Sequence, residues 1–279
     1  MGVTAVAKKD FRDSIRSYTL LGLVLSFTAF AAGLAVIQWV PPLYRDSTVE
    51  TSTLALLNSM RQPTVFFVPL ISLAVTYNTI AGERESGSMR LLLALPNSRR
   101  DVVFGKYLGR TSVLVVGLLV GYAVAGLVAL LTYESFDIAV FGLYTALTLF
   151  YGAVYTALAT GFSAGMDSRF KALAGASALY SLFLLGWDVL LLVLQLLVYG
   201  QDIPEGGLPD WFNFIGLLNP STAFMHAARA VIPEYAQITF YPESSAFYLQ
   251  DWVGFVVLVV WAVVPLTLGY LRFARADIQ

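Results

Sequence analysis

Six long apolar stretches constrain this chain more than any other feature of its sequence. Each is close to the roughly 20 residues that a helix needs to cross the ~30 Å hydrocarbon core of a bilayer. Lipid offers no partners to backbone amides, so a crossing segment of this kind must be helical. The chain is 58% hydrophobic and 13% charged, against about 25% charged residues in soluble domains. The sequence therefore predicts an all-α integral membrane protein with spans near 18–40, 64–82, 111–132, 139–163, 172–198 and 252–272.

The basic residues distinguish the two sides of this predicted bundle. Of 17 Lys and Arg residues, only Arg45, Arg61 and Arg229 fall on one side. Lys and Arg near span ends accumulate in the cytoplasm. We therefore expect a plasma-membrane protein whose two termini, 83–110 loop and 165–171 connection are cytoplasmic. The opposite loops carry acidic residues: Glu134, Asp137, Asp202, Glu205, Asp210, Glu234, Glu243 and Asp251.

Residues 1–17 are predicted to form an amphipathic helix in the inner interface. Val3, Val6, Phe11 and Ile15 recur at helical spacing, with charged residues between them. The alternative is an ordinary basic flank that only fixes the topology.

The 83–110 loop is longer than two adjacent spans need, and long ordered loops are commonly functional. Met89, Leu91 and neighbouring leucines predict a short apolar helix that ends before Pro96. Ser98 with Asp101 resembles a capping box, from which a new helix runs into the third span. Two interpretations remain open: this loop docks on a soluble partner, or its arginines rest on anionic lipid headgroups.

Asp188 is the one acidic or basic residue deep within a predicted span. A charge inside the membrane is costly, which makes it a candidate for the transport pathway. Alternatively it is a structural carboxylate, protonated or paired with Tyr180 or Gln195.

Between the last two spans, the 199–251 region is the one long external segment, and its apolar stretches predict short helices in the outer interface. They either cap the pathway or simply pack over the bundle. Met225 and His226 raise the alternative of a copper site, but no ligand spacing supports it, so no metal site is predicted.

Several function classes are disfavoured. A net charge of −1 gives no basic surface for nucleic acid, and the chain has no cysteine and a single histidine. It contains neither an HExxH motif nor a Walker motif, since Gly105 and Lys106 are followed by Tyr107. We expect no catalytic residue and no cofactor bound by this chain.

The sequence GERESGSMRLLLALPNSRRDVVFGKYLG resembles the cytoplasmic loop of type II ABC exporter permeases, in particular the NosY-like branch of the ABC-2 permease family. The pattern there is roughly G-E-R-E-x-G-T, then L-x-S-x-P-x-S-R and later G-K. Ser88 stands for the Thr, and Ala94 lies near the usual Ser. The matching residues are Gly82, Glu83, Arg84, Glu85, Gly87, Pro96, Ser98, Arg99, Gly105 and Lys106.

This resemblance implies a single permease domain over residues 1–279, with six spans and a second permease copy or homologue. It also implies that the 83–110 loop is a coupling helix, inserted into a separate ATPase subunit that holds ATP and Mg²⁺. The residues expected at that contact are Glu83, Arg84, Glu85, Gly87, Met89, Arg90, Leu91, Pro96, Ser98, Arg99, Arg100 and Lys106. Asp167 and Arg169 are expected to form a second contact.

The favoured function is therefore the permease subunit of an ATP-driven transporter, working as an exporter. One alternative is a secondary transporter or channel, although these usually show repeated halves and several charges near the midplane. Another is a membrane scaffold that recruits a soluble partner without moving a solute. Co-purification with an ATPase separates the first function from the other two.

Overall fold

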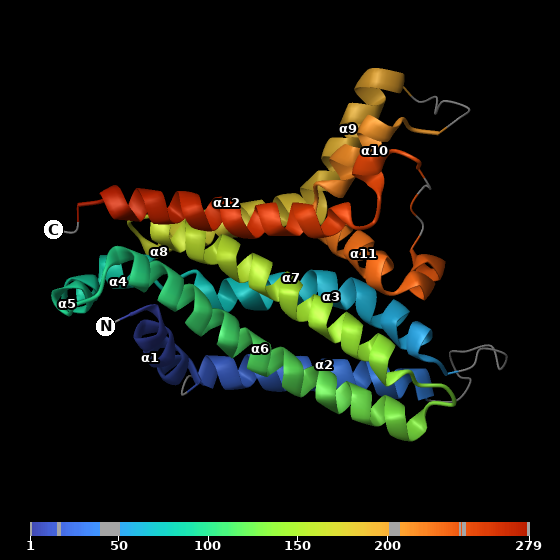
Figure 1. The fold of residues 1–279 in the computed structure, drawn as a ribbon, viewed down its shortest axis with the longest axis horizontal. Helices are drawn as coiled ribbons and strands as arrows, with labels where there is room; N and C mark the ends of the chain where they lie inside the picture. The colour runs from blue at the N-terminus through green and yellow to red at the C-terminus, as the bar shows by residue number, and fades with distance from the viewer. Residues whose placement is uncertain are drawn as a thin grey trace.

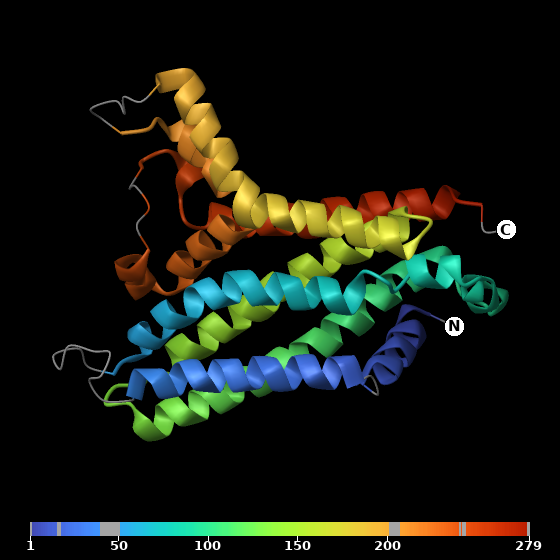
Figure 2. The same cartoon turned by 180° about the vertical axis from the view of Figure 1, so that it is seen from behind.

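The computed structural model describes residues 2–15, 18–39, 51–200, 207–239, 241 and 244–277. Arg16, Arg45, Asp202, Glu205 and Glu243, which the sequence singled out by charge, lie outside these residues. The described chain is almost wholly helical, with one isolated bridge between Ser52 and Ser135 and no strand within the described ranges. Long helices form an elongated bundle with both termini at one end (Figures 1 and 2).

The helices follow one another along the chain in the order shown in Figure 1. They are α1 (Val3–Ile15), α2 (Tyr18–Trp39), α3 (Thr53–Thr76), α4 (Ala81–Glu85), α5 (Ser88–Ala94), α6 (Arg99–Thr132), α7 (Ile138–Gly165), α8 (Arg169–Ser181), α9 (Trp187–Tyr199), α10 (Asp210–Leu217), α11 (Pro220–Val231) and α12 (Val253–Arg275). A π-helical turn, Leu182–Gly186, joins α8 to α9, and two 3₁₀ turns, Pro233–Ile238 and Phe247–Leu249, lie between α11 and α12.

The all-α membrane fold predicted from the sequence is confirmed. Within the described residues, five helical segments are long and apolar enough to cross a bilayer, and they coincide with the second to sixth predicted spans. The first predicted span corresponds to α2, whose shorter apolar part is Leu25–Ile37. The predicted short helices between the last two spans are α10 and α11.

Two helices begin earlier than the hydropathy pattern predicts. α3 begins at Thr53 rather than near residue 64. Ser52 caps this start, because its Oγ atom accepts a hydrogen bond from the amide of Ala55. Arg61 does not end the helix, because its guanidinium donates to the carbonyl oxygen of Ile238. α6 begins at Arg99, so the third span and the helix leading into it form one rod of 34 residues.

The core is built around α7, which packs against α12, α3 and α6, while α2 packs along α6. α7 and α12 cross with their backbones nearly touching, and glycines make this approach possible. A Cβ atom added to Gly161 would lie 2.3 Å from the carbonyl oxygen of Pro265, and one added to Gly269 would lie 2.2 Å from that of Gly161. Small residues allow the same close approach between membrane helices generally.

The fifth predicted span is the helix least covered by the rest of the chain. From its π-helical turn onward it leaves the bundle at an angle, with α10 beside it (Figure 1). No side chain of α9 is buried, and nine of its 13 residues are Leu or Val.

Candidate functional site

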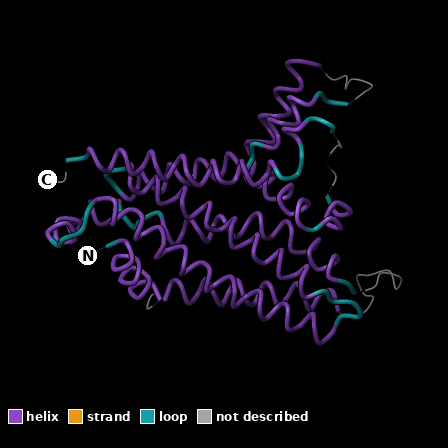
Figure 3. Tube along the Cα trace, in the orientation of Figure 1, coloured by secondary structure: helices purple, strands orange, loops and turns teal. Residues whose placement is uncertain are grey.

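α4 and α5 form a small helical hairpin, Ala81–Ala94, that projects from the end of the bundle where both termini lie (Figure 3). Gly87 joins the two helices with φ of 76°, in the left-handed region that favours glycine. α5 ends as predicted before Pro96, because Leu95 adopts an extended conformation. The side-chain amide of Asn97 then donates to the carbonyl oxygen of Leu92 at 3.2 Å and closes the turn.

The predicted capping box at the start of α6 is confirmed. The Oγ atom of Ser98 accepts from the amide of Asp101 at 3.1 Å, and the carboxylate of Asp101 accepts from the amide of Ser98 at 2.9 Å. The local sequence therefore fixes where the hairpin ends and the third span begins.

α5 has one buried face and one free face. Met89 and Leu92 pack into a small apolar core with Ile80, Val102 and Phe273. Leu91 and Leu95 point outward, with 75% and 46% of their surface exposed. Leu91, Leu95 and the exposed Arg90, Pro96 and Arg100 are here called the tip surface.

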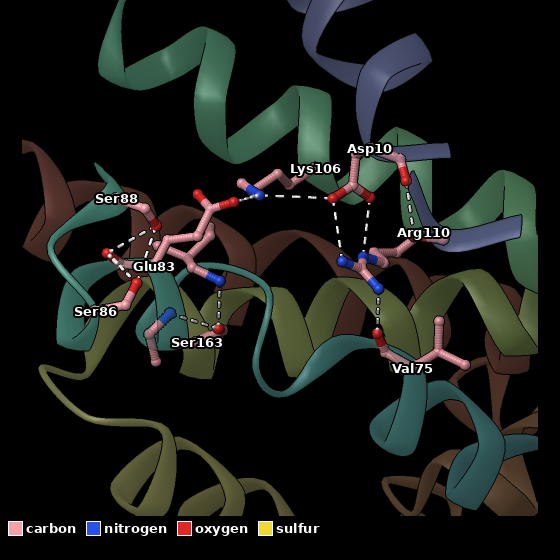
Figure 4. A network of polar contacts seen from close by, with 11 residues as sticks. Asp10, Val75, Glu83, Ser86, Ser88, Lys106, Arg110 and Ser163 are labelled. Atoms are coloured by element: carbon pink, nitrogen blue, oxygen red, sulfur yellow. Dashed lines mark hydrogen bonds and ion pairs between the residues drawn. The ribbon is translucent and has the colours of Figure 1, made fainter. Parts of the chain in front are cut away.

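Four charged side chains from α1, α4 and α6 meet behind the hairpin (Figure 4). The Nζ atom of Lys106 lies 2.7 Å from Glu83 Oε1 and 3.5 Å from Asp10 Oδ1. The guanidinium of Arg110 lies 2.9 Å from Asp10 Oδ2 and also donates to the carbonyl oxygen of Val75 at 2.9 Å. We call Asp10, Glu83, Lys106 and Arg110 the charged cluster; its two acids and two bases balance.

Glycines on α6 let α1 come close enough to complete the charged cluster. A Cβ atom on Gly105 would lie 2.6 Å from the Cβ atom of Val6, and one on Gly109 would lie 2.8 Å from the carboxylate of Asp10. Lys106, between these two glycines, is consequently almost fully buried.

The face of α1 that packs on the protein differs from the apolar face identified in the sequence. Val6, Asp10 and Ser14 are its buried residues, whereas Ile15 is exposed. Asp10 forms ion pairs with Lys106 and Arg110, although its Oδ2 atom makes no hydrogen bond within the described residues, and the hydroxyl of Ser14 donates to the carbonyl oxygen of Asp10. The apolar pattern could not indicate this face, because the cations that pair with Asp10 lie about 100 residues further along the chain.

Backbone contacts fix the hairpin to the rest of the bundle. The hydroxyl oxygen of Ser163, on α7, accepts from the amides of Ile80 and Ala81, both at 3.0 Å. Arg84 donates to the carbonyl oxygen of Met166 at 2.7 Å.

Arg99 joins the start of α6 to the end of α12. It donates to the carbonyl oxygens of Phe273, Ala274 and Ala276 at 2.7, 2.9 and 2.7 Å. Its guanidinium lies 5.8 Å from the ring centroid of Phe273, which Arg84 approaches at 6.0 Å. These carbonyls are the groups that a helix leaves unpaired at its C-terminus.

The second predicted contact lies beside the first. The carboxylate of Glu85 accepts from the amide of Arg169 at 2.9 Å and lies 3.4 Å from its Nε atom. Asp167 instead pairs with Lys171 at 2.9 Å.

The residues proposed from the sequence for the ATPase contact therefore separate into two groups. Glu83, Arg84, Met89, Arg99 and Lys106 are turned toward the bundle and hold the hairpin in place. The outward group is exposed at the surface: Glu85, Arg90, Leu91, Pro96, Ser98 and Arg100. Gly87, in the turn between the two helices, is half-buried. Sequence reasoning did not identify Asp10, Ser163 and Phe273. The sequence does carry one signal of the contact that Asp10 makes, because Gly105 and Gly109, four residues apart, are typical of close helix packing.

Asp188 lies apart from this site, on the exposed side of α9. Of the two partners that the sequence offered as an alternative, Tyr180 is engaged elsewhere, since its hydroxyl donates to the carbonyl oxygen of Phe66 at 2.8 Å.

At the opposite end of the bundle, His226 of α11 is held by charged neighbours. Its Nδ1 atom lies 2.8 Å from Asp251 Oδ1, and the Nε atom of Arg229 lies 3.3 Å from Asp251 Oδ2. Burial lowers the pKa of the imidazole, although the bond to Asp251 acts in the opposite direction. No group of three or more potential ligand residues (His, Cys, Asp or Glu) that could hold a metal occurs among the described residues.

A family model described as an ABC-2 family transporter protein matches residues 4–278, almost the whole chain that forms this bundle and hairpin. The chain belongs to the ABC-2 transporter family. Two curated relatives agree with this ABC-2 assignment. A probable ABC transporter permease protein NosY from Pseudomonas aeruginosa is 29% identical over 286 residues, covering 99% of both chains. A protein of the same description from Stutzerimonas stutzeri is 30% identical over 223 residues, covering 78% of both. The resemblance seen in the 83–110 loop is thus confirmed: this is an ABC-2 permease subunit similar to NosY.

Proposed function

We propose that this permease works with a separate ABC ATPase subunit, which binds the tip surface and supplies ATP and Mg²⁺. The observation that carries the proposal is the exposure of Leu91 and Leu95 on a hairpin whose other side is firmly held. Apolar side chains left exposed and rimmed by arginines are typical of a protein contact. The excess of basic residues at this end of the bundle supports a cytoplasmic position for the hairpin, where ATP is available.

The proposed work cycle is mechanical. ATP-driven movement of the partner displaces the hairpin, and the charged cluster and Arg99 carry that displacement to α1, α6 and α12. Export is the proposed direction, as in the exporters that the loop resembles.

The test is co-purification of the full-length permease with its cognate ATPase. Leu91→Asp should reduce ATPase recovery at least about tenfold, because a carboxylate cannot be buried in an apolar contact without loss. Leu91→Met keeps the apolar character and should retain the ATPase. Equal recovery with both variants would refute the docking assignment. Substrate-dependent ATP hydrolysis by the complex would then separate a transporter from a scaffold.

We also propose that a second permease copy covers α9. An exposed Asp188 among exposed Leu and Val side chains is unfavourable against lipid, because an ionised carboxylate is poorly solvated by hydrocarbon. A second subunit would shield this carboxylate and place it along a pathway between the copies.

Because the chain has no cysteine, single-cysteine crosslinking is a direct test of this second copy. Leu192→Cys should form disulfide-linked dimers, whereas Leu127→Cys, equally exposed but on α6, should not. Crosslinking of both variants, or of neither, would contradict this arrangement.

A further inference from the structure

A narrow apolar crevice lies between α7, α8 and α12, near the end of the bundle that holds the hairpin. Its volume is about 310 Å³, within the range of small ligand sites. The lining is apolar except at one point, where Arg272 of the last turn of α12 lies at its edge. Val264 and Leu268 line one wall and are themselves about half exposed, so the crevice opens sideways, toward the surrounding bilayer.

The crevice has the length of one membrane leaflet. Its lining on α12 extends from Trp261 to Arg272, eleven residues apart, which is about 16 Å along a helix. One leaflet contributes about half of the ~30 Å hydrocarbon thickness. An apolar slot of that length with a cation at one end matches the two chemical parts of a phospholipid.

Arg272 has no partner within the described parts of the protein. Arg99 binds the carbonyls that end α12 and Lys171 pairs with Asp167, whereas Arg275, in the same turn as Arg272, lies outside the lining of the crevice. An unpaired guanidinium at the mouth of an apolar slot is complementary to a phosphate, with which arginine forms bidentate hydrogen bonds.

Gly165, at the end of α7, keeps the slot open beside Arg272. Unlike Gly161 and Gly269, it is not required for helix packing. A Cβ atom added there would meet only the Cδ atom of Arg272 at 3.7 Å and the Cα atom of Gly269 at 3.8 Å, which are ordinary contacts. Its φ is not positive either, so its backbone conformation does not demand glycine.

We propose that this crevice is a binding site for an anionic phospholipid, with an acyl chain between α7, α8 and α12 and the headgroup phosphate on Arg272. The apolar walls offer water too few hydrogen-bond partners, so water is disfavoured in the slot. A lipid chain can enter the slot laterally from the bilayer without crossing the protein. The site is independent of the ATPase contact.

The experiment uses the purified full-length chain in detergent, titrated with phosphatidylglycerol or phosphatidylcholine carrying brominated acyl chains. Bromine quenches tryptophan fluorescence on contact, and Trp261 lies in the crevice wall. The part of the quenching that arises in the crevice should be lost in Trp261→Phe, which leaves the other four tryptophans in place. Phosphatidylglycerol should bind more tightly than phosphatidylcholine by roughly fivefold, the factor expected for one cation near an anionic headgroup.

Matched variants separate the two halves of the site. Arg272→Gln should remove the preference for phosphatidylglycerol, whereas Arg275→Gln, in the same turn but outside the lining, should keep it. Gly165→Leu should fill the slot and abolish the quenching of Trp261 by both lipids. Gly142→Leu places the same side chain at an open position of α7 far from the slot and should have no effect.

Equal affinity for the two lipids in the unaltered protein, or equal effects of Arg272→Gln and Arg275→Gln, would overturn the headgroup assignment. Undiminished quenching in Gly165→Leu would overturn the acyl-chain assignment. Thermal unfolding verifies that each variant is folded. If Gly165→Leu does not fold, Arg272→Gln and Arg275→Gln still test the headgroup assignment, because both substitutions lie on an exposed helix end.

Discussion

Lys106 is the centre of the charged cluster, because its ammonium group lies between carboxylates from α1 and α4. Its side chain is only 5% exposed. Removing one member of a buried ion pair leaves the other charge without compensation, and that loss exceeds the value of the pair itself.

We predict that Lys106→Met lowers the free energy of unfolding by about 3 kcal/mol, the lower bound for breaking a buried pair. The double variant Lys106→Met/Glu83→Gln should recover part of that loss, because it removes the orphaned charge as well. Thermal unfolding of the single and double variants measures the coupling. Additive losses would mean that the two side chains do not interact.

His226 is predicted to make stability depend on pH. Its pKa in the folded protein is lowered from 6.5, chiefly by burial, so the unfolded chain takes up the proton more readily. Stability should therefore be complete above pH 6.5 and decline as the pH falls from there toward the lowered folded value. The groups that face the ring are Asp251, Arg229 and Tyr241.

The control for this pH dependence is His226→Gln, which removes the titrating group. Its unfolding temperature should change less between pH 7.5 and pH 5.5 than that of the unaltered protein. An identical pH profile in the variant would assign the acid sensitivity to other groups.

Residues whose roles depend on near neighbours in the chain were predictable. The capping box of Ser98 and Asp101 and the stop before Pro96 are local, so the sequence indicated both. Asp10 and Phe273 depend on partners 100 and 174 residues away, and no pattern within one segment could reveal them.

At the scale of elements, the crossing of α7 and α12 is the tightest contact between two long helices. The atoms that an added Cβ would meet at Gly269 belong to the backbone of Gly161, so no side chain can move aside.

We predict that Gly269→Ala destabilises the protein by roughly 1–3 kcal/mol through overpacking. Gly142→Ala is the matched control, because nothing lies within 4 Å of the added methyl group. It should be neutral or stabilising by up to ~1 kcal/mol, since alanine favours helix over glycine. Thermal unfolding in detergent measures both, and equal behaviour of the two variants would contradict the crossing geometry.

Helix existence was predictable, but helix ends were less so. Hydropathy placed the start of the second span at residue 64, whereas α3 continues outward to Thr53. A hydropathy criterion detects contact with lipid, and it cannot detect a helix that extends beyond the membrane and is supported by protein. The π-helical turn Leu182–Gly186 was also missed, because its residues are as apolar as those of a regular helix.

At the scale of the whole molecule, the hairpin is attached to three parts of the chain. Ser163 holds its start on α7, the charged cluster holds it to α1 and α6, and Arg99 holds its exit to α12. Under the proposed mechanism, a displacement of the hairpin would reach the bundle through these three attachments.

We predict that Arg99→Ala leaves the spans inserted and the ATPase bound, but greatly reduces substrate-dependent ATP hydrolysis. The reason is that the hydrogen bonds between the start of α6 and the end of α12 are then lost, leaving only the apolar packing around Phe273. Arg275→Ala, in the last turn of α12 and without such bonds, is the control. Normal coupling in Arg99→Ala, measured in proteoliposomes, would show that this link is dispensable.

The family was predictable from the 83–110 loop because its motif is contiguous in the sequence. The division of that loop into an outward tip surface and an inward scaffold was not. Arg84 and Arg90 look alike in the sequence, yet one binds the carbonyl oxygen of Met166 and the other is exposed.

α12 spans 23 residues, or about 35 Å. At one end Arg99 donates hydrogen bonds to its last carbonyl oxygens. At the other end it packs closely on α11, where a Cβ atom on Gly254 would lie 2.3 Å from the carbonyl oxygen of Ala223. α12 therefore contacts the hairpin end of the bundle through Arg99 and the opposite end through α11. Pro265 lies within this helix and removes one of its backbone hydrogen bonds, so a displacement at one end would be partly absorbed there before it reached α11.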